Sequence, residues 1–279
     1  MADQKNNKKF YELTPSGRLE QLAEGTRLAP AALDALSGAQ GLNLAQADHM
    51  IENVVGTYAL PLGVAQHFLV NGRDVPVPMV IEEPSVVAAA SFMARLARAG
   101  GGFTASATAP EMIGQMQVLD IPDLQQAKAA LEAQRENLLA EADKIDPLLL
   151  KLGGGARDLQ VRLIEDSPIG PFLVLHLIMD VRDAMGANAV NTALERLAPQ
   201  VEGISGGRVL LRILSNLADR RLARAQCRIP LEALAFNDFS GGEVRDRIIE
   251  AWAFAAADPY RAATHNKGIM NGVDAVVIA

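Results

Sequence analysis

The stretch from residue 114 to residue 215 constrains the fold most, because strand and helix patterns alternate there in a regular order. Strands are predicted by the apolar or alternating runs "GQMQVLDI", "DLQVRLIED", "PFLVLHLIMDV" and "GRVLLRILS". Helices are predicted by "LQQAKAALEAQRENLLAEADKI", read as one long amphipathic helix, and by "DAMGANAVNTALERLA". Together these elements follow the order β-α-β-β-α-β, which is that of the split βαβ or ferredoxin-like unit.

The chain on either side of this unit has a different character, which indicates a small domain inserted into a larger one. Upstream, a strand up to Ile81, a helix from Ser85 and a hinge or domain boundary over residues 100–110 are expected. Downstream, we expect a helix over "EVRDRIIEAWAFAAA", a shorter helix from Asp258 to about Gly268, and a final strand "VDAVVIA". The prediction is an α+β fold, with a large mixed α/β substrate domain (residues 1–110 and 216–279) and an inserted ferredoxin-like small cofactor domain (residues 111–215).

Charge and cysteine content exclude several classes of function. The 26 basic and 33 acidic residues give a net charge of −7, which disfavours nucleic acid and offers no polybasic membrane surface. Neither a signal peptide nor an apolar run long enough to span a bilayer is present, so a cytoplasmic protein without membrane attachment is expected. The single cysteine, Cys227, excludes an internal disulfide, and the four scattered histidines lack metal-ligand spacing, so no metal is expected.

The glutamate pair in "MVIEEPSVVAAAS" lies between two apolar runs and is a candidate for acid catalysis. Burial would raise the pKa of a carboxyl group there and produce an acid able to donate a proton near neutral pH. Glu83 is the better candidate of the two, because it precedes Pro84 at the end of the predicted strand. The alternative is that acidic residues simply favour the N-terminus of a helix.

Two further motifs suggest binding of anions. In "DAMGAN", Asp183 can cap a helix whose small first residues would let a pyrophosphate approach the free backbone N–H groups. Close packing of a helix on a sheet explains the same small residues and stays open as an alternative. In "ATHNKGIMNG", Lys267 lies among glycines and neutral hydrogen-bonding side chains, with Arg261 upstream, which suggests an anionic substrate with an oxygen that gains negative charge. A solvated lysine beside the end of a helix is the alternative there.

Five motifs in order carry a resemblance to a known family. They are "IENVVGTYALP", "NGRDVPVPMVIEEPSVVAAASFMA", "VRDAMGANAVNT", "LRILSNLAD" and "DPYRAATHNKGIMNG". The chain thereby resembles the class II, bacterial-type 3-hydroxy-3-methylglutaryl-coenzyme A reductases. The resemblance implies a large domain for the acyl-CoA, an inserted small domain for a nicotinamide cofactor, and interconversion of hydroxymethylglutaryl-CoA with mevalonate and CoA by two hydride transfers.

The resemblance also implies roles for individual residues. Catalytic roles fall to Glu83, Lys267 and Asn271, with Lys267 stabilising the oxyanion and Glu83 protonating the carbonyl oxygen. Substrate-binding roles fall to Ser85, Arg261 and Thr264 around the hydroxymethylglutaryl carboxylate, to Asn216 near the reacting carbon, and to Glu52 and Asn53 at a site shared by two subunits of a homodimer.

For the cofactor, the matching residues are Asp183, Met185, Gly186 and Asn188, together with Asp146 at the end of the predicted long helix. A carboxylate at position 146 can accept from the adenosine ribose hydroxyls and would repel a 2′-phosphate, so NAD(H) is expected rather than NADP(H).

Departures from the family pattern define the alternatives. Chains of the family continue past Ala279 and there supply an aspartate and a histidine for catalysis, and His265 is no substitute, so this chain is expected to be truncated. Tyr11 stands where a basic residue facing the CoA phosphates is expected. The rival interpretation is a non-catalytic CoA- or nucleotide-binding dimer, and a third is a packing role for the polar motifs around a plain regulatory module.

Overall fold

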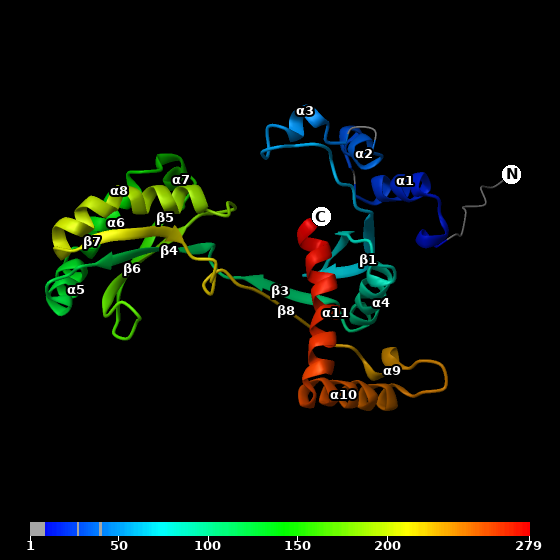
Figure 1. Cartoon of the computed structure of the whole chain (residues 1–279). Coiled ribbons are helices and arrows are strands. Elements are labelled where there is room, and N and C mark those ends of the chain that lie inside the picture. Colours follow the sequence, from blue (N-terminus) through cyan, green and yellow to red (C-terminus); the bar gives the residue numbers. More distant parts are fainter. Residues whose placement is uncertain (1–8, 27, 39–40) are drawn as a thin grey trace.

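The computed structural model describes residues 9–26, 28–38 and 41–279. Two lobes, each built on a four-stranded sheet, are joined by a two-stranded ribbon (Figure 1). The small lobe holds the sheet of order β5-β6-β4-β7, and the large lobe holds the sheet of order β2-β1-β3-β8. The fold is therefore mixed α/β with two separate sheets, as predicted.

The small lobe has the element order expected from the sequence. Its strands are β4 (Glu111–Leu119), β5 (Gly155–Ile164), β6 (Phe172–Asp180) and β7 (Arg208–Leu214), and neighbouring strands are antiparallel. Its helices are α5 (Leu124–Ala133), α6 (Arg135–Asp143), α7 (Pro147–Lys151) and α8 (Ala187–Ser205). The order β-α-β-β-α-β is therefore present, with helices at both positions where the sequence predicted a helical connection.

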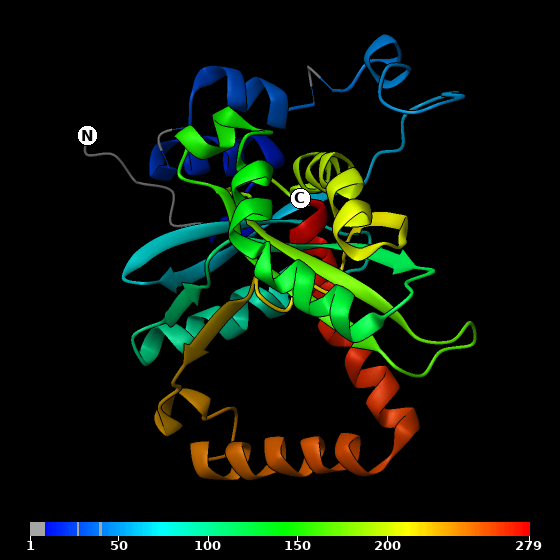
Figure 2. The same ribbon diagram turned by 90° about the vertical axis from the view of Figure 1, so that its left-hand side faces the viewer.

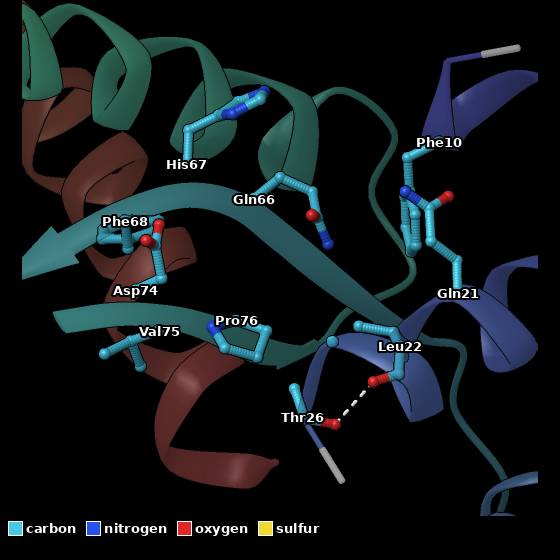
Figure 3. A pocket seen from close by; sticks show the side chains of 11 residues that line it. Phe10, Gln21, Leu22, Thr26, Gln66, His67, Phe68, Asp74, Val75 and Pro76 are labelled. Atoms are coloured by element: carbon cyan, nitrogen blue, oxygen red, sulfur yellow. Dashed lines mark hydrogen bonds between the residues drawn. The ribbon is translucent and has the colours of Figure 1, made fainter. Parts of the chain in front are cut away.

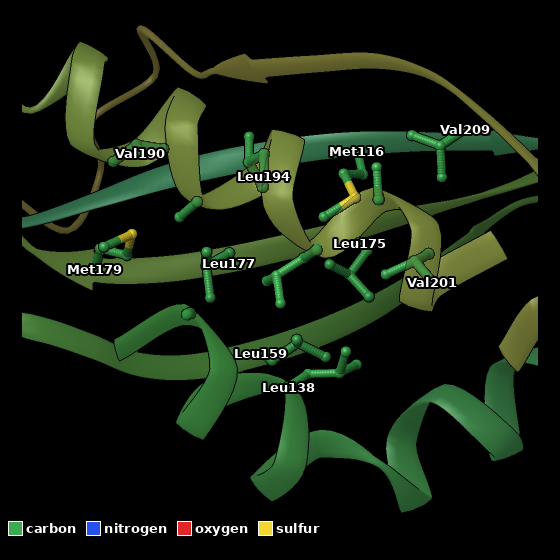
Figure 4. Packing of buried hydrophobic residues seen from close by; sticks show 14 of the residues in the cluster. Met116, Leu138, Leu159, Leu175, Leu177, Met179, Val190, Leu194, Val201 and Val209 are labelled. Carbon is green, nitrogen blue, oxygen red and sulfur yellow. The ribbon is translucent and has the colours of Figure 1, made fainter. Parts of the chain in front are cut away.

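One apolar cluster holds the small lobe together (Figure 4). Alternate residues of β6, among them Leu173, Leu175 and Leu177, are fully buried because they face the helices. Helix α8 contributes residues at helical spacing, such as Val190 and Leu194, to the same cluster. Burial of each such side chain contributes about 1.5–3 kcal/mol, so this lobe has a core of its own.

The prediction of a single long helix over residues 124–145 was wrong. Helix α5 ends at Ala133, and Gln134, with φ −94° and ψ 8°, separates it from α6. A further short helix, α7, begins after Asp146, which its proline at position 147 favours. Helical spacing continues across both breaks, so the apolar pattern alone could not locate them.

The large lobe packs two helices on one face of its sheet. Its elements are a 3₁₀ turn (Phe10–Glu12), α1 (Pro15–Thr26), α2 (Pro30–Leu36), α3 (Leu44–Ala47), β1 (Leu62–Val70), β2 (Arg73–Val80), α4 (Val86–Ala99), β3 (Phe103–Ala107), β8 (Ala223–Cys227), α9 (Leu231–Leu234), α10 (Gly241–Ala257) and α11 (Pro259–Ile278). Helix α4 packs on β1 and α11 packs on β2. Ala65, Met79 and Ala275 form the buried centre of this contact.

One prediction about the large lobe missed a strand and another was wrong. The stretch predicted as a hinge or domain boundary, residues 100–110, leads from one lobe to the other but also contains β3, which pairs with β8 about 120 residues later along residues 103–107 and 223–227. The final strand "VDAVVIA" is instead part of α11, which runs without a break to Ile278. A strand needs a partner to bond its backbone, whereas the helix satisfies its own groups and buries Ala275 on the sheet.

The view along the small lobe shows α10 lying across one end of the molecule and α11 rising from it (Figure 2). Asp258 lies between these helices and accepts from the backbone N of Arg261 at 2.7 Å, as the sequence predicted for the start of α11. None of the helices in the described part of the chain combines the length and hydropathy needed to cross a bilayer.

Candidate active site

Three predicted catalytic side chains, from segments far apart in sequence, meet in the large lobe. The Nζ of Lys267 lies 2.5 Å from Oε2 of Glu83 and donates to it, across 184 residues of chain. The Nδ2 of Asn271 donates to the same oxygen at 3.1 Å. An ammonium, a carboxylate and an amide therefore form one polar cluster at the end of β2.

Helix packing puts these groups together. Glu83 lies between the end of β2 and the start of α4, two residues before Ser85, whose φ of 75° places it in the left-handed region. On α11, Lys267 and Asn271 are four residues apart and therefore share a face with Ala275, one turn further along. Because Ala275 is buried against β1 and β2, the same face presents Lys267 to Glu83.

Glu83 is held as a carboxylate. The hydrogen bond from Lys267 lowers the pKa of Glu83 below its ordinary value of 4.5 and outweighs the desolvation that opposes it. The Glu83 side chain is 45% exposed and that of Lys267 is 61% exposed. The predicted rise in the pKa of Glu83 was therefore wrong, because desolvation can raise a carboxyl pKa only where water is excluded.

The residues predicted to hold the substrate carboxylate lie near this cluster in sequence and structure. Thr264 is on α11, three residues before Lys267, and its Oγ1 donates to the backbone O of Tyr260 at 3.0 Å. Ser85 is exposed at the start of α4, and Arg261 is half-buried at the start of α11.

Three other predicted substrate residues lie elsewhere. Asn216 is exposed in the segment after β7, and Glu52 and Asn53 are exposed in the turn after α3. Within residues 9–26, 28–38 and 41–279, none of them hydrogen-bonds to Glu83 or Lys267. A single copy of the chain thus assembles the Glu83–Lys267–Asn271 cluster without them.

Three of the predicted cofactor residues, Asp183, Met185 and Gly186, lie in the loop between β6 and α8 that we call the 181–186 loop, and Asn188 is on the first turn of α8. Asp183 does not cap α8 as predicted, since the capping position is Gly186, with φ 98°. A Cβ at Gly186 would lie 2.6 Å from Cγ1 of Val181, so this position needs glycine. Met185 and Asn188 are exposed on either side of it.

Asp146 also differs from the prediction. It lies at the start of α7 rather than at the end of one long helix, and its Oδ1 accepts from the backbone N of Leu149 at 2.9 Å. Helix α7 ends at Lys151, and a turn of three residues leads to Gly155, the first residue of β5, which pairs with Asp180 at the end of β6. Asp146 and the 181–186 loop are therefore attached to the same end of the sheet.

A charged cluster that the sequence did not reveal supports this loop. Asp180 is 3% exposed and accepts from the backbone N of Arg182 at 3.0 Å, from Nε of Arg182 at 2.7 Å and from Nη2 of Arg157 at 3.3 Å. The hydrogen bonds from Arg182 lower the pKa of Asp180. The only sequence signal is the i, i+2 spacing in "DVR", because the contribution of Arg157 depends on strand pairing.

A cavity of about 460 Å³ lies between α1 and the β1–β2 hairpin (Figure 3). Phe10, Gln66 and Asp74 are among its lining residues, and the amide of Gln66 points into it. No predicted site residue lines it. In the described part of the chain, no three His, Cys, Asp or Glu side chains are grouped to hold a metal ion.

The chain matches a known protein family over most of its length. The model of the family described as hydroxymethylglutaryl-coenzyme A reductase matches residues 14–279. The chain belongs to this reductase family. It is 52% identical over 271 residues to 3-hydroxy-3-methylglutaryl-coenzyme A reductase of Archaeoglobus fulgidus, covering 97% of this chain and 60% of that one. It is 30% identical over 236 residues to a probable reductase of Borreliella burgdorferi, covering 83% of this chain and 52% of that one.

Solved structures of the reductase family agree in fold. The reductase of Streptococcus pneumoniae superposes with a TM-score of 0.90 at 42% identity, over 97% of this chain and 72% of that one. A class II structure from the same organism, bound to NADPH in open conformations, matches equally well over 73% of its chain. The likeness to class II reductases expected from the motifs is thus confirmed, while the chain spans only 60% of its archaeal relative.

Proposed function

We propose that this chain carries the reaction centre of a hydroxymethylglutaryl-CoA reductase, which interconverts hydroxymethylglutaryl-CoA with mevalonate and CoA. The observation that carries the proposal is the cluster of Lys267, Glu83 and Asn271, in a chain that belongs to the reductase family. The nicotinamide cofactor supplies two hydrides when bound. The reaction also needs the substrate to be oriented, the developing charge to be stabilised and protons to be supplied. We assign these tasks to side chains of the protein.

Lys267 is the group that meets the developing negative charge. Its ammonium is a strong donor, and an oxyanion formed on the thioester carbonyl would be stabilised by it at hydrogen-bond distance. Glu83 accepts a hydrogen bond from this ammonium and thereby orients it, and the bond lowers the pKa of Glu83, so in the ligand-free protein Lys267 is the donor of the pair. Asn271 leaves one amide hydrogen free to donate after bonding Glu83.

The hydroxymethylglutaryl carboxylate is assigned to Arg261, Ser85 and Thr264. Arginine binds a carboxylate through two parallel N–H groups, and the serine hydroxyl can donate a third bond. The hydroxyl of Thr264 donates within its own helix, so it must rotate before it can donate to the substrate.

We assign the cofactor to the 181–186 loop and Asp146, and favour NAD(H). The first N–H groups of α8 have no capping side chain, which suits a pyrophosphate. Asp146 uses one oxygen on Leu149, so its second oxygen remains for the ribose hydroxyls and would repel a 2′-phosphate. Since the Streptococcus pneumoniae relative was solved with NADPH, the dissociation constants of NADH and NADPH should be compared directly, and tighter binding of NADPH would overturn the preference.

We also propose that residues 1–110 and 216–279 serve the acyl-CoA, that residues 111–215 serve the cofactor, and that two copies share each site. The turn that carries Glu52 and Asn53 exposes Ile51, Val55 and Tyr58 at 67%, 98% and 87%. Apolar side chains this open favour contact with a second copy. Sedimentation velocity tests this directly, and a monomer at micromolar concentration would contradict it.

The decisive experiment compares two lysine variants. Lys267→Met removes the oxyanion donor and is expected to lower turnover of hydroxymethylglutaryl-CoA by about 100-fold or more. Lys144→Met removes an exposed lysine that pairs with Glu141 and should leave turnover unchanged. Consumption of NADH is followed on this chain and on any longer form of it. Binding of both ligands without turnover in either form would favour the non-catalytic binding dimer, and equal turnover in both variants would refute the role of Lys267.

A further inference from the structure

Arg221 contacts the 181–186 loop from a distant part of the chain. Its Nη1 donates to the backbone O of Ala184 at 2.6 Å, and its Nη2 donates to the backbone O of Arg182 at 3.1 Å. Arg221 lies 37 residues after Ala184 in sequence, on the segment between β7 and β8. Arg221 is not among the residues to which substrate or cofactor binding is assigned above.

The loop itself has few internal contacts to fix its middle. Arg182 has φ 54° and Gly186 has φ 98°, so both ends of the loop are in the left-handed region. Asp180 holds the backbone N and the guanidinium of Arg182 at the first end. Between the ends, Asp183, Ala184 and Met185 are exposed, and the bond from N of Ala184 to O of Val181 spans 3.2 Å. Arg221 therefore ties the exposed part of the loop to the rest of the molecule.

The hydrogen bonds from Arg221 to two backbone carbonyls of the loop determine where the neighbouring N–H groups point. A trans peptide is planar, so its N–H points opposite to its C=O. With the C=O groups of Arg182 and Ala184 turned toward Arg221, the N–H groups of Asp183 and Met185 point away from it. Neither N–H bonds to another group in the described part of the chain. Both are thus free to donate to an anion beside the N-terminus of α8.

Arg221 is itself held where the chain passes between the lobes. The backbone O of Arg220 accepts from Oγ1 of Thr108 at 2.5 Å, and the backbone N of Leu222 donates to the same Oγ1 at 2.8 Å. The guanidinium of Arg220 pairs with Glu111 at 3.2 Å. The residues on both sides of Arg221 are thus bonded to the other strand of the connection.

We propose that Arg221 is a positioning residue for the cofactor, which holds the 181–186 loop with its N–H groups directed at the pyrophosphate before the cofactor arrives. A loop ordered in advance loses less conformational freedom on binding, so affinity rises without a direct contact from Arg221. The same bonds link the cofactor site to the connection between the lobes. The inference rests on the proposed binding of a nicotinamide cofactor by this loop.

Arg221→Met tests the proposal, with Arg224→Met as the matched control. Arg224 is exposed on β8, only three residues away, and within the described residues no hydrogen bond or ion pair joins it to the loop. We expect Arg221→Met to raise the dissociation constant of NADH by about tenfold, since two charge-assisted hydrogen bonds to the loop are lost. The affinity for hydroxymethylglutaryl-CoA should not change in either variant. Hydrogen exchange at the amide of Ala184, which donates to O of Val181, should in the cofactor-free protein be faster only in Arg221→Met.

The outcomes separate this inference from the proposed function. Wild-type protein that binds NADH, with Arg221→Met binding it equally well, would overturn the positioning role. Wild-type protein that does not bind NADH would refute the cofactor assignment, and the exchange rate of the Ala184 amide would then decide whether Arg221 positions the loop. If Arg221→Met does not fold, as judged by circular dichroism, Arg221→Lys replaces it. One ammonium cannot reproduce the planar two-point contact, so we expect a rise of about threefold, and wild-type affinity would overturn the inference.

Discussion

Replacing Gly186 by alanine should destabilise the small lobe by an amount that the structure allows us to work out. At φ 98° an L-residue with a side chain is strained by about 1–2 kcal/mol. The added Cβ would also lie 2.6 Å from Cγ1 of Val181, which is 1% exposed and cannot move away freely. Overpacking of this kind costs about 1–3 kcal/mol. The sum is about 2–5 kcal/mol, which at a urea slope of about 2 kcal/mol per M would lower the urea midpoint of the small lobe by about 1–2.5 M.

A glycine in the same helix provides the control. A Cβ at Gly203 meets nothing within 4 Å, and Gly203 lies inside α8 with helical neighbours. Gly203→Ala should therefore stabilise the protein by about 0.5–1 kcal/mol. Urea unfolding is followed by far-ultraviolet circular dichroism for both variants and for Gly186→Ala combined with Val181→Ala. The combined variant should lose less than the sum of the single changes, because the steric conflict is shared. If Gly186→Ala unfolds at the wild-type midpoint, the description of the loop as closed around Val181 is refuted.

Three other predictions test different contacts. The hydrogen bond from Lys267 lowers the pKa of Glu83, so its stabilisation is present above the ordinary value of 4.5 and is lost as the pH falls through the folded value. The difference in Tm between wild type and Glu83→Gln should therefore be constant near neutral pH and shrink as the pH falls below 4.5, and a constant difference down to pH 3 would contradict it. Asp180→Asn leaves Arg157 and Arg182 facing a neutral, poorly matched group, and chemical denaturation should show a loss of about 2–3 kcal/mol, against less than about 0.5 kcal/mol for the exposed Asp120→Asn. Gly268→Ala should raise stability by about 0.5–1 kcal/mol because residue 268 is inside a helix, and no gain would indicate that α11 is interrupted there.

Local signals in the sequence were sufficient for most of the secondary structure. The strand and helix patterns of residues 111–215 predicted the order of elements, because each element buries an alternating or helical set of residues. The pairing of β3 with β8 was not predictable, since it depends on a partner about 120 residues away. The C-terminal segment was misread for a related reason, because a short apolar run has the same composition in a buried helix and in a strand.

The candidate site shows the same division. Sequence motifs indicated Glu83 and Lys267 as candidates, and the family resemblance placed both in one site. Their contact could not be predicted from a local pattern, because 184 residues separate them in sequence. The pKa shift of Glu83 was predicted in the wrong direction. The sign of that shift depends on how exposed the side chain is, and the packing of α11 on β2 determines this exposure. The cluster around Asp180 needs the register of β5 on β6, and a bulge between Ala156 and Asp158 shifts that register.

The place where the chain leaves the large lobe and returns to it has a consequence for engineering. Thr108 and Leu222 face each other there, with the backbone N of Thr108 donating to O of Leu222 at 2.9 Å. The strands that lead to them are antiparallel, so a short hairpin turn could close them if everything between were excised. The excised piece would keep its whole apolar cluster, since the members of that cluster fall between residues 112 and 218. Both pieces should therefore fold when expressed separately, and each could be exchanged with its counterpart from a relative without redesigning the other.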